Sequence, residues 1–153
     1  MRQLFFALAL LAAACATPTA RADEIAADPQ LAQTCVTEAG ADYAALERCK
    51  GVVANACIEA EGPSTMSLVL CWSAEYAVWR AMIETSTARI EAADAEKGIR
   101  LQRANEAWQA WLDAECDYFS YEFGGGSGEQ VERVQCAVVL THRRAIDLLA
   151  PFN

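Results

Sequence analysis

Apolar residues recur along most of the chain at the spacing of α-helices. Between residues 65 and 97 they mostly follow steps of three, four and seven, which places on one helical face Leu68, Trp72, Tyr76, Trp79, Ile83 and Ile90. Residues 101–123 and 131–148 show the same pattern. The period-two alternation typical of half-buried strands is absent from the sequence. The pattern therefore predicts an all-α protein.

Proline, glycine and a capping residue divide the first part of the chain into two short helices. Pro29 opens the first helix, which ends near Gly40. Asp42 caps the second helix, which runs to about Glu61. Pro63 ends the second helix, because proline has no backbone amide hydrogen and clashes with the preceding turn.

The remaining boundaries predict three longer helices. Ser64 or Thr65 starts the first of them, and the Lys-Gly pair at 97–98 marks a break or kink before the second. The glycine run at 124–128 ends the second, and Pro151 lies beyond the end of the third. Short turns between long helices favour antiparallel hairpins. We therefore expect an all-α antiparallel bundle of four to five helices.

Six cysteines lie beyond residue 22, and spacing alone allows them fifteen pairings. Taken in order they form three neighbouring pairs: Cys35 with Cys49, Cys57 with Cys71, and Cys116 with Cys136. The midpoints of these pairs are Asp42, Ser64 and Gly126, each within or beside a predicted turn. Residues equidistant from the turn of an antiparallel hairpin lie at the same height, where Cα atoms reach the ~5.5 Å that a disulfide needs. The spacing thus predicts disulfides 35–49, 57–71 and 116–136.

Cysteine content and charge limit the possible classes of function. Seven cysteines in 153 residues indicate an oxidising compartment. No two cysteines are closer than eight positions and there is one histidine, so the close ligand pairs of a zinc site are missing and we expect no metal or cofactor. The chain has 21 acidic and 12 basic residues, a net charge of −9, which argues against a nucleic-acid partner.

The first 22 residues are typical of a secretory signal peptide. Arg2 is followed by an apolar run over residues 4–16 and by a small-x-small pattern at 20–22. Cleavage after Ala22 leaves one domain, residues 23–153, with 21 acidic and 10 basic residues and a net charge of −11. No later stretch of the sequence is apolar enough for a transmembrane segment. The protein is therefore expected in the periplasm or outside the cell.

Cys15 offers an alternative, which is a lipid anchor at that cysteine. A lipoprotein signal carries a larger aliphatic residue three positions earlier, where this sequence has Ala12. The soluble, cleaved form is therefore the preferred interpretation. Nothing in the sequence specifies an oligomeric state.

The residues that could take part in catalysis are each expected to have a structural role instead. His142 has no nucleophile beside it and is expected as an exposed residue near a helix C-terminus. The acidic clusters at 113–117 and 91–96 are expected to be solvated faces, and the glycine run a flexible turn. Trp108 and Trp111 are expected to anchor the core. The sequence therefore indicates a protein that is not an enzyme.

Three blocks of residues have an order and spacing that is typical of one family. The blocks are Cys57 and Cys71 with Glu75 and Trp79; Trp108 and Trp111 with Asp113 and Cys116; and Gly125, Gly126 and Ser127 with Cys136, Thr141 and Arg144. Together they resemble the lysozyme inhibitor LprI-like family over residues 57–148. This resemblance implies an exported, disulfide-containing helical domain and an inhibitor of lysozyme.

The sequence departs from the family pattern at three positions. Asn105 stands where the family often has Gln, Leu112 where it often has Arg, and Arg80 where it often has Asp. These departures leave the fold intact but weaken the transfer of any particular polar network. The resemblance carries over no inhibitory residue.

Charge makes a basic lysozyme, or another muramidase, a reasonable protein partner. A protein at −11 is steered toward a basic partner, and an exposed loop can then block the substrate groove. The candidate surface is the glycine turn with its flanking acids: Glu122, Gly125, Gly126 and Glu129. The alternative is a periplasmic interaction or structural protein that binds another envelope component and has no effect on lysozyme.

Overall fold

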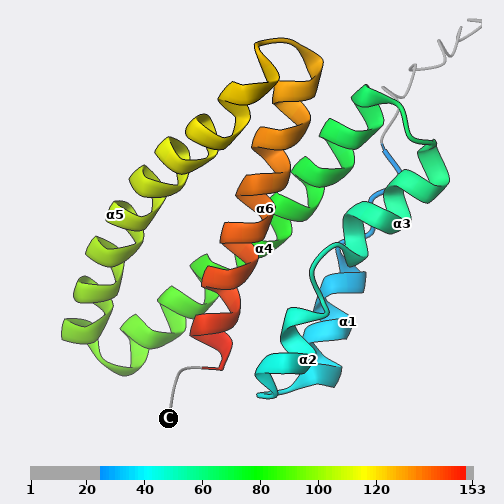
Figure 1. Cartoon of the computed structure of the whole chain (residues 1–153). Helices are drawn as coiled ribbons and strands as arrows, with labels where there is room; N and C mark the ends of the chain where they lie inside the picture. Colours follow the sequence, from blue (N-terminus) through cyan, green and yellow to red (C-terminus); the bar gives the residue numbers. More distant parts are fainter. Residues whose placement is uncertain (1–24, 151–153) are drawn as a thin grey trace, which may run out of the picture.

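The computed structural model describes residues 25–150, which are almost entirely helical (Figure 1). The elements are α1 (Gln30–Ala39), α2 (Tyr43–Glu47), α3 (Val52–Glu61), α4 (Thr65–Ala93), α5 (Ala95–Ser120), the 3₁₀-helix η1 (Tyr121–Phe123) and α6 (Ser127–Leu149). No strand occurs within the described range, and the predicted all-α class is confirmed. The predicted signal peptide at 1–22, with Cys15, lies outside the described residues.

The long helix α4 is the centre of the bundle. It contacts α3, α5 and α6, and α5 and α6 form a hairpin whose turn lies at one end of the molecule (Figure 1). The short helices α1 and α2 pack with α3 and α6 on the side opposite to α5. Within residues 25–150, none of the helices has the length and apolarity needed to cross a bilayer.

The core lies where α1, α3, α4 and α6 meet around Trp79. Trp79 is fully buried, and burial of so large an apolar side chain stabilises the fold by about 2–3 kcal/mol. The buried residues packed together with it are Ala32, Cys49, Val53, Ile83, Val138 and Ala145. Trp108 is partly buried against this cluster, in agreement with its expected role. Trp111, by contrast, is 48% exposed, so its predicted role as a core anchor is wrong.

Three disulfides join neighbouring elements at the pairs that turn symmetry predicts. Cys35–Cys49, Cys57–Cys71 and Cys116–Cys136 have Cα–Cα distances of 5.7, 5.6 and 5.5 Å. They link α1 to the segment after α2, α3 to α4, and α5 to α6. Each disulfide closes a hairpin and lowers the conformational entropy of the unfolded chain. For loops of this length, this stabilises the fold by about 3 kcal/mol.

The single helix predicted over 42–61 is two helices. Asp42 caps α2 as expected, since its carboxylate accepts a hydrogen bond from Ala45 N at 3.0 Å. The chain then leaves the helical path, and Gly51, with φ of 87°, starts α3. A left-handed φ is open to glycine at little cost, so the break falls at this residue.

The turn between α4 and α5 lies at Asp94 and not at residues 97–98. Asp94 ends α4 and also caps α5, since its carboxylate accepts a hydrogen bond from Lys97 N at 3.0 Å. Gly98 lies inside α5 and is buried against α4. A Cβ at Gly98 would lie 2.6 Å from Glu91 Cβ, so this glycine permits close approach of the two helices.

Candidate functional site

The carboxylate of Glu75 on α4 is completely buried and fully hydrogen-bonded. Its Oε1 accepts from the backbone N–H of Gly51 and from Trp79 Nε1, the latter at 3.0 Å. Its Oε2 accepts from Val53 N at 3.1 Å and Ala54 N at 2.8 Å. Three of these donors are the free amides at the start of α3, where a negative charge is also favoured by the helix dipole. Glu75 therefore joins α4 to the N-terminus of α3.

His142 on α6 lies in the core, and the expectation that it is exposed is wrong. Its side chain is 1% exposed, and Nε2 donates a hydrogen bond to the Leu46 carbonyl at 3.0 Å. The ring meets Trp79 edge-on, with centroids 4.7 Å apart. Burial lowers the pKa of His142. His142 follows Val138 by four residues and precedes Ala145 by three, so helical register places it on the buried face of α6.

A series of side-chain hydrogen bonds connects the three long helices α4, α5 and α6. Arg144 on α6 donates from Nε and Nη2 to Asn105 Oδ1 at 3.1 and 2.8 Å. Asn105 Nδ2 in turn donates to Thr87 Oγ1 on α4 at 3.0 Å. The residue that departs from the family pattern at 105 therefore still binds Arg144.

The remaining predicted motif residues of α5 and α6 lie in different surroundings. Asp113 is exposed and accepts a hydrogen bond from Gln109 Nε2 at 3.0 Å. Gln109 Oε1 also accepts from Arg80 at 3.3 Å, which links α4 and α5 at the surface. Thr141 is fully buried, and its hydroxyl has no hydrogen-bond partner in the described part of the chain.

These contacts indicate that the buried residues Glu75, Trp79 and His142 hold the helices together. Glu75, Trp79 and His142 contact one another or backbone, and their polar atoms are occupied by the protein itself. Over residues 25–150, no group of three His, Cys, Asp or Glu side chains is arranged to hold a metal ion. A surface for a partner must therefore be sought elsewhere.

The most prominent exposed feature is the end of the α5–α6 hairpin, residues 117–129, which we call the hairpin tip. η1 is followed by three glycines with left-handed φ, Gly124 to Gly126, at 68°, 80° and 101°. A shallow hollow at the tip is lined by Tyr121, Glu122, Gly124, Gly125 and Glu129. The structure thus brings three of the four predicted partner-contact residues into one hollow, and the fourth, Gly126, is the next residue in the chain.

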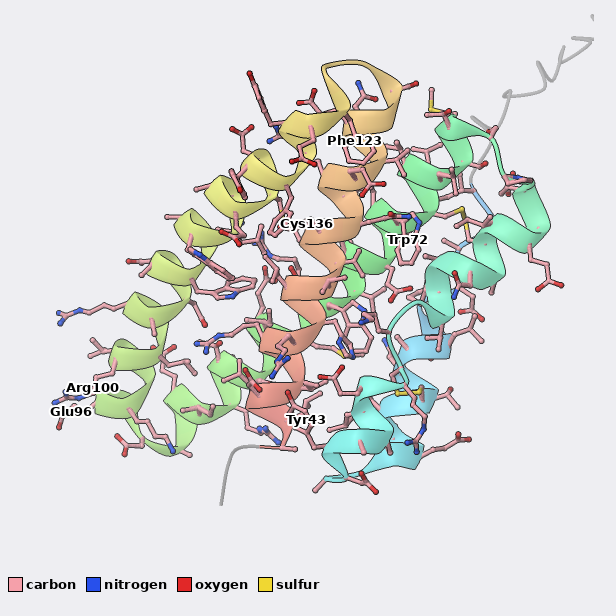
Figure 2. All side chains as sticks on the ribbon, in the orientation of Figure 1. Tyr43, Trp72, Glu96, Arg100, Phe123 and Cys136 are labelled. Carbon is pink, nitrogen blue, oxygen red and sulfur yellow. A yellow bond between two sulfur atoms is a disulfide. The ribbon has the colours of Figure 1, made fainter. Side chains whose placement is uncertain are left out.

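Four aromatic side chains are exposed at the hairpin tip, including Phe119, which helical spacing predicts on the apolar face of its helix. Tyr118, Phe119, Tyr121 and Phe123 are 71%, 57%, 81% and 50% exposed. Tyr118 and Phe119 contact each other edge-on with centroids 5.4 Å apart, and Figure 2 shows Phe123 close to the turn. Four aromatic residues among six positions exceed what one buried helical face can hold. This density was the available signal in the sequence.

The base of the hairpin tip is firmly connected to the bundle. The Cys116–Cys136 disulfide joins α5 and α6 directly below the tip, with Cys136 on α6 (Figure 2). Arg133 forms an ion pair with Asp117 across the two helices and lies 3.7 Å from Glu129 on its own helix. These contacts neutralise Arg133, so the tip presents acidic and aromatic groups to solvent.

Comparison with known proteins identifies a family for most of the described chain. Residues 57–148 match the family described as lysozyme inhibitor LprI. The matched segment begins within α3 and includes α4, α5 and nearly all of α6, with the Cys57–Cys71 and Cys116–Cys136 disulfides and the hairpin tip. The comparisons with curated proteins and with solved structures find no match. Since the matched segment covers more than half of the chain, the protein belongs to the lysozyme inhibitor LprI family.

Proposed function

We propose that this protein is exported and inhibits a basic lysozyme by binding it through an acidic surface. The observation that carries the proposal is the family match over residues 57–148. Within the matched segment, Glu75, Trp79 and His142 support a role as scaffold, because their hydrogen bonds are made to the protein itself. The proposed activity is therefore binding without catalysis.

Charge supports a basic partner. The chain carries a net charge of −9, or −11 once residues 1–22 with their two arginines are removed. Complementary charge raises association rates with a basic protein, and the effect falls as salt screens it. At the hairpin tip, Glu122 is exposed and Glu129 lines the hollow, so these carboxylates are placed to meet a basic surface.

Two observations support export: the pattern of the N-terminal residues and the three disulfides. The N-terminal 22 residues have the pattern of a cleaved signal peptide, and a lipid anchor at Cys15 is the alternative. Three disulfides support an oxidising compartment, where such bonds persist. Residues 23–153 are proposed to act there as a single domain.

The hairpin tip is the proposed site of contact. Gly125 and Gly126 carry no side chains, so backbone at the turn can approach a partner closely. The disulfide below the tip reduces the entropy that a free loop would lose on binding. The protein therefore offers a projecting, anchored element suited to block a groove.

The test pairs binding kinetics with loss of lysozyme activity. We expect the oxidised protein to bind a basic lysozyme and to stop cell-wall hydrolysis, with an association rate that falls as salt rises. Glu122→Gln/Glu129→Gln should lower the association rate at low salt by roughly tenfold. Glu38→Gln/Glu59→Gln removes equal charge from exposed sites on α1 and α3 and should change it less.

Two results would contradict the proposal. Binding without inhibition would show only attraction between opposite charges. Neither binding nor inhibition by correctly folded protein would favour the alternative, an envelope interaction or structural protein that does not act on lysozyme.

A further inference from the structure

We infer that the aromatic rings of the hairpin tip enter the substrate cleft of the lysozyme, while the carboxylates of the tip stay at its rim. This inference rests on the proposed function and specifies how the two proteins meet. The rings concerned are those of Tyr121 and Phe123 at the end of the hairpin, supported by Tyr118 and Phe119 on the last turn of α5.

The exposure of these rings is unusual for a surface. Tyr121 is 81% exposed and Phe123 50% exposed, although aromatic side chains gain most from burial. Exposed large apolar residues elsewhere in the described chain are spread over several helices: Leu31, Met66, Leu70, Ile99, Trp111 and Val139. Aromatic residues gathered at one projecting end are typical of the central contacts of protein interfaces.

The chemistry of the cleft decides which side chains enter it. Lysozymes cleave glycosidic bonds between two carboxyl groups at the bottom of a groove. Glu122 or Glu129 placed there would bring like charges together in a poorly solvated site, which costs free energy. The rings of Tyr121 and Phe123 carry no charge and avoid this cost.

The carboxylates of the tip are then left to face the basic outer surface of the partner. Asp117 is already paired with Arg133. Glu122 is exposed and forms no ion pair within residues 25–150, while Glu129 shares Arg133 with Asp117 through an ion pair of 3.7 Å. An uncharged centre with an acidic rim matches a groove in a basic protein.

The same acidic rim opposes docking of two tips against each other, because like charges would meet.

The backbone that carries these rings is also held in place before binding. Ser120, directly before η1, is buried and donates to the Asp117 carbonyl at 3.2 Å. Phe123 packs beside the first turn of α6, where a Cβ on Gly128 would lie 3.7 Å from its ring. With the Cys116–Cys136 disulfide below, the backbone of the tip loses little freedom on binding, and pre-organisation of this kind strengthens affinity.

The experiment compares the inhibition constant of the oxidised protein with that of Tyr121→Ala/Phe123→Ala, using a basic lysozyme at ~150 mM salt. We expect inhibition to weaken by roughly 30-fold or more, as for the loss of central interface residues. Leu31→Ala/Ile99→Ala removes two exposed apolar side chains from α1 and α5 far from the tip in sequence, and should change inhibition less than about threefold. Circular dichroism and thiol titration verify that each variant is folded and oxidised.

A second measurement tests entry into the cleft. A trimer of N-acetylglucosamine occupies the sugar-binding groove, so it should compete with the wild-type protein for lysozyme. Absence of competition would overturn the inference, as would full inhibition by the folded Tyr121→Ala/Phe123→Ala variant. Dimerisation of the wild type that these substitutions abolish would also overturn it, by identifying the tip as a contact between copies. Failure of the wild type itself to inhibit would instead refute the proposed function.

Discussion

Glu75 and Trp79 lie one turn apart on α4, and the indole Nε1 of Trp79 donates a hydrogen bond to Glu75 Oε1 at 3.0 Å. Both side chains are fully buried. The carboxylate receives the free amides at the start of α3, and the indole meets His142 of α6. This pair of residues, which lies within the segment that matches the family, therefore joins three helices in the core.

Replacing Glu75 by glutamine should destabilise the protein strongly. A glutamine side chain has one acceptor oxygen, and its NH₂ group would face backbone donors that now bind Oε2. Leaving such buried donors unpaired costs about 3 kcal/mol. Urea unfolding measures the difference. Glu106→Gln, on an exposed carboxylate, is the control and should change stability by less than about 0.5 kcal/mol.

The stability of the fold should depend on pH through His142. Its pKa in the folded protein is lowered by burial from the ordinary value of 6.5, so the unfolded chain takes up a proton first as pH falls. Stability is thus highest above about pH 6.5, decreases as pH falls below it, and levels off below the folded pKa. The slope is at most about 1.4 kcal/mol per pH unit from this one group.

Comparing wild type with His142→Gln between pH 7.5 and about pH 5 isolates this contribution. Glutamine does not titrate in that range and retains an N–H that can donate to the Leu46 carbonyl. The stability of the variant should depend less on pH than that of the wild type. Equal slopes for the two proteins would show that His142 takes up its proton as readily when folded as when unfolded.

Gly98→Ala should destabilise the protein, although alanine favours helices by about 1 kcal/mol over glycine. The added Cβ would lie 2.7 Å from Glu91 Cα, and backbone must move to relieve this contact. We expect a net loss of about 1–3 kcal/mol in thermal or urea unfolding.

Gly128→Ala is the matched control for this prediction. Gly128 lies in the first turn of α6, and its added Cβ would be 3.7 Å from Phe123, an ordinary contact. This variant should be neutral or more stable by about 0.5–1 kcal/mol. A stabilising Gly98→Ala would show that α4 and α5 separate at no cost.

Removing the disulfide below the hairpin tip should affect inhibition more than its stability cost explains. Cys116→Ala/Cys136→Ala opens a loop with a sequence separation of 20 and should cost about 3 kcal/mol. Cys35→Ala/Cys49→Ala opens one of 14 and should cost a similar amount. At a temperature where both variants remain folded, only the first should inhibit lysozyme more weakly. Equal inhibition constants would show that anchoring the tip is irrelevant to binding.

Features of the fold that depend on local sequence could be predicted. The apolar period of 65–90 predicts α4, Asp42 caps α2, and the residues around Ser64 end one helix and begin the next with a mutual Ser64–Ser67 cap. The spacing of cysteines about turns likewise matches the three disulfides. In each case the residues involved are close in sequence, so the signal is contained in a short segment.

Features that depend on how one helix packs against another were missed or misplaced. Gly98 resembles a helix break in the sequence, but its role is to admit Glu91 from the neighbouring helix. His142, the one histidine of the sequence, resembles a surface residue. Its hydrogen-bond partner is the carbonyl of Leu46, which is 96 positions away and is brought next to it only by the fold. Phe119 fits the helical pattern of its segment, but it is 57% exposed at the hairpin tip and does not belong to the core.

The most direct test of the central claim is a titration of lysozyme activity with the oxidised protein. Increasing amounts of protein are added to a panel of lysozymes acting on cell walls at ~150 mM salt, where charge attraction beyond ~8 Å is screened. The account predicts that hydrolysis by at least one basic lysozyme stops at a one-to-one ratio. Undiminished hydrolysis across the panel, with the fold and all three disulfides verified, would contradict it.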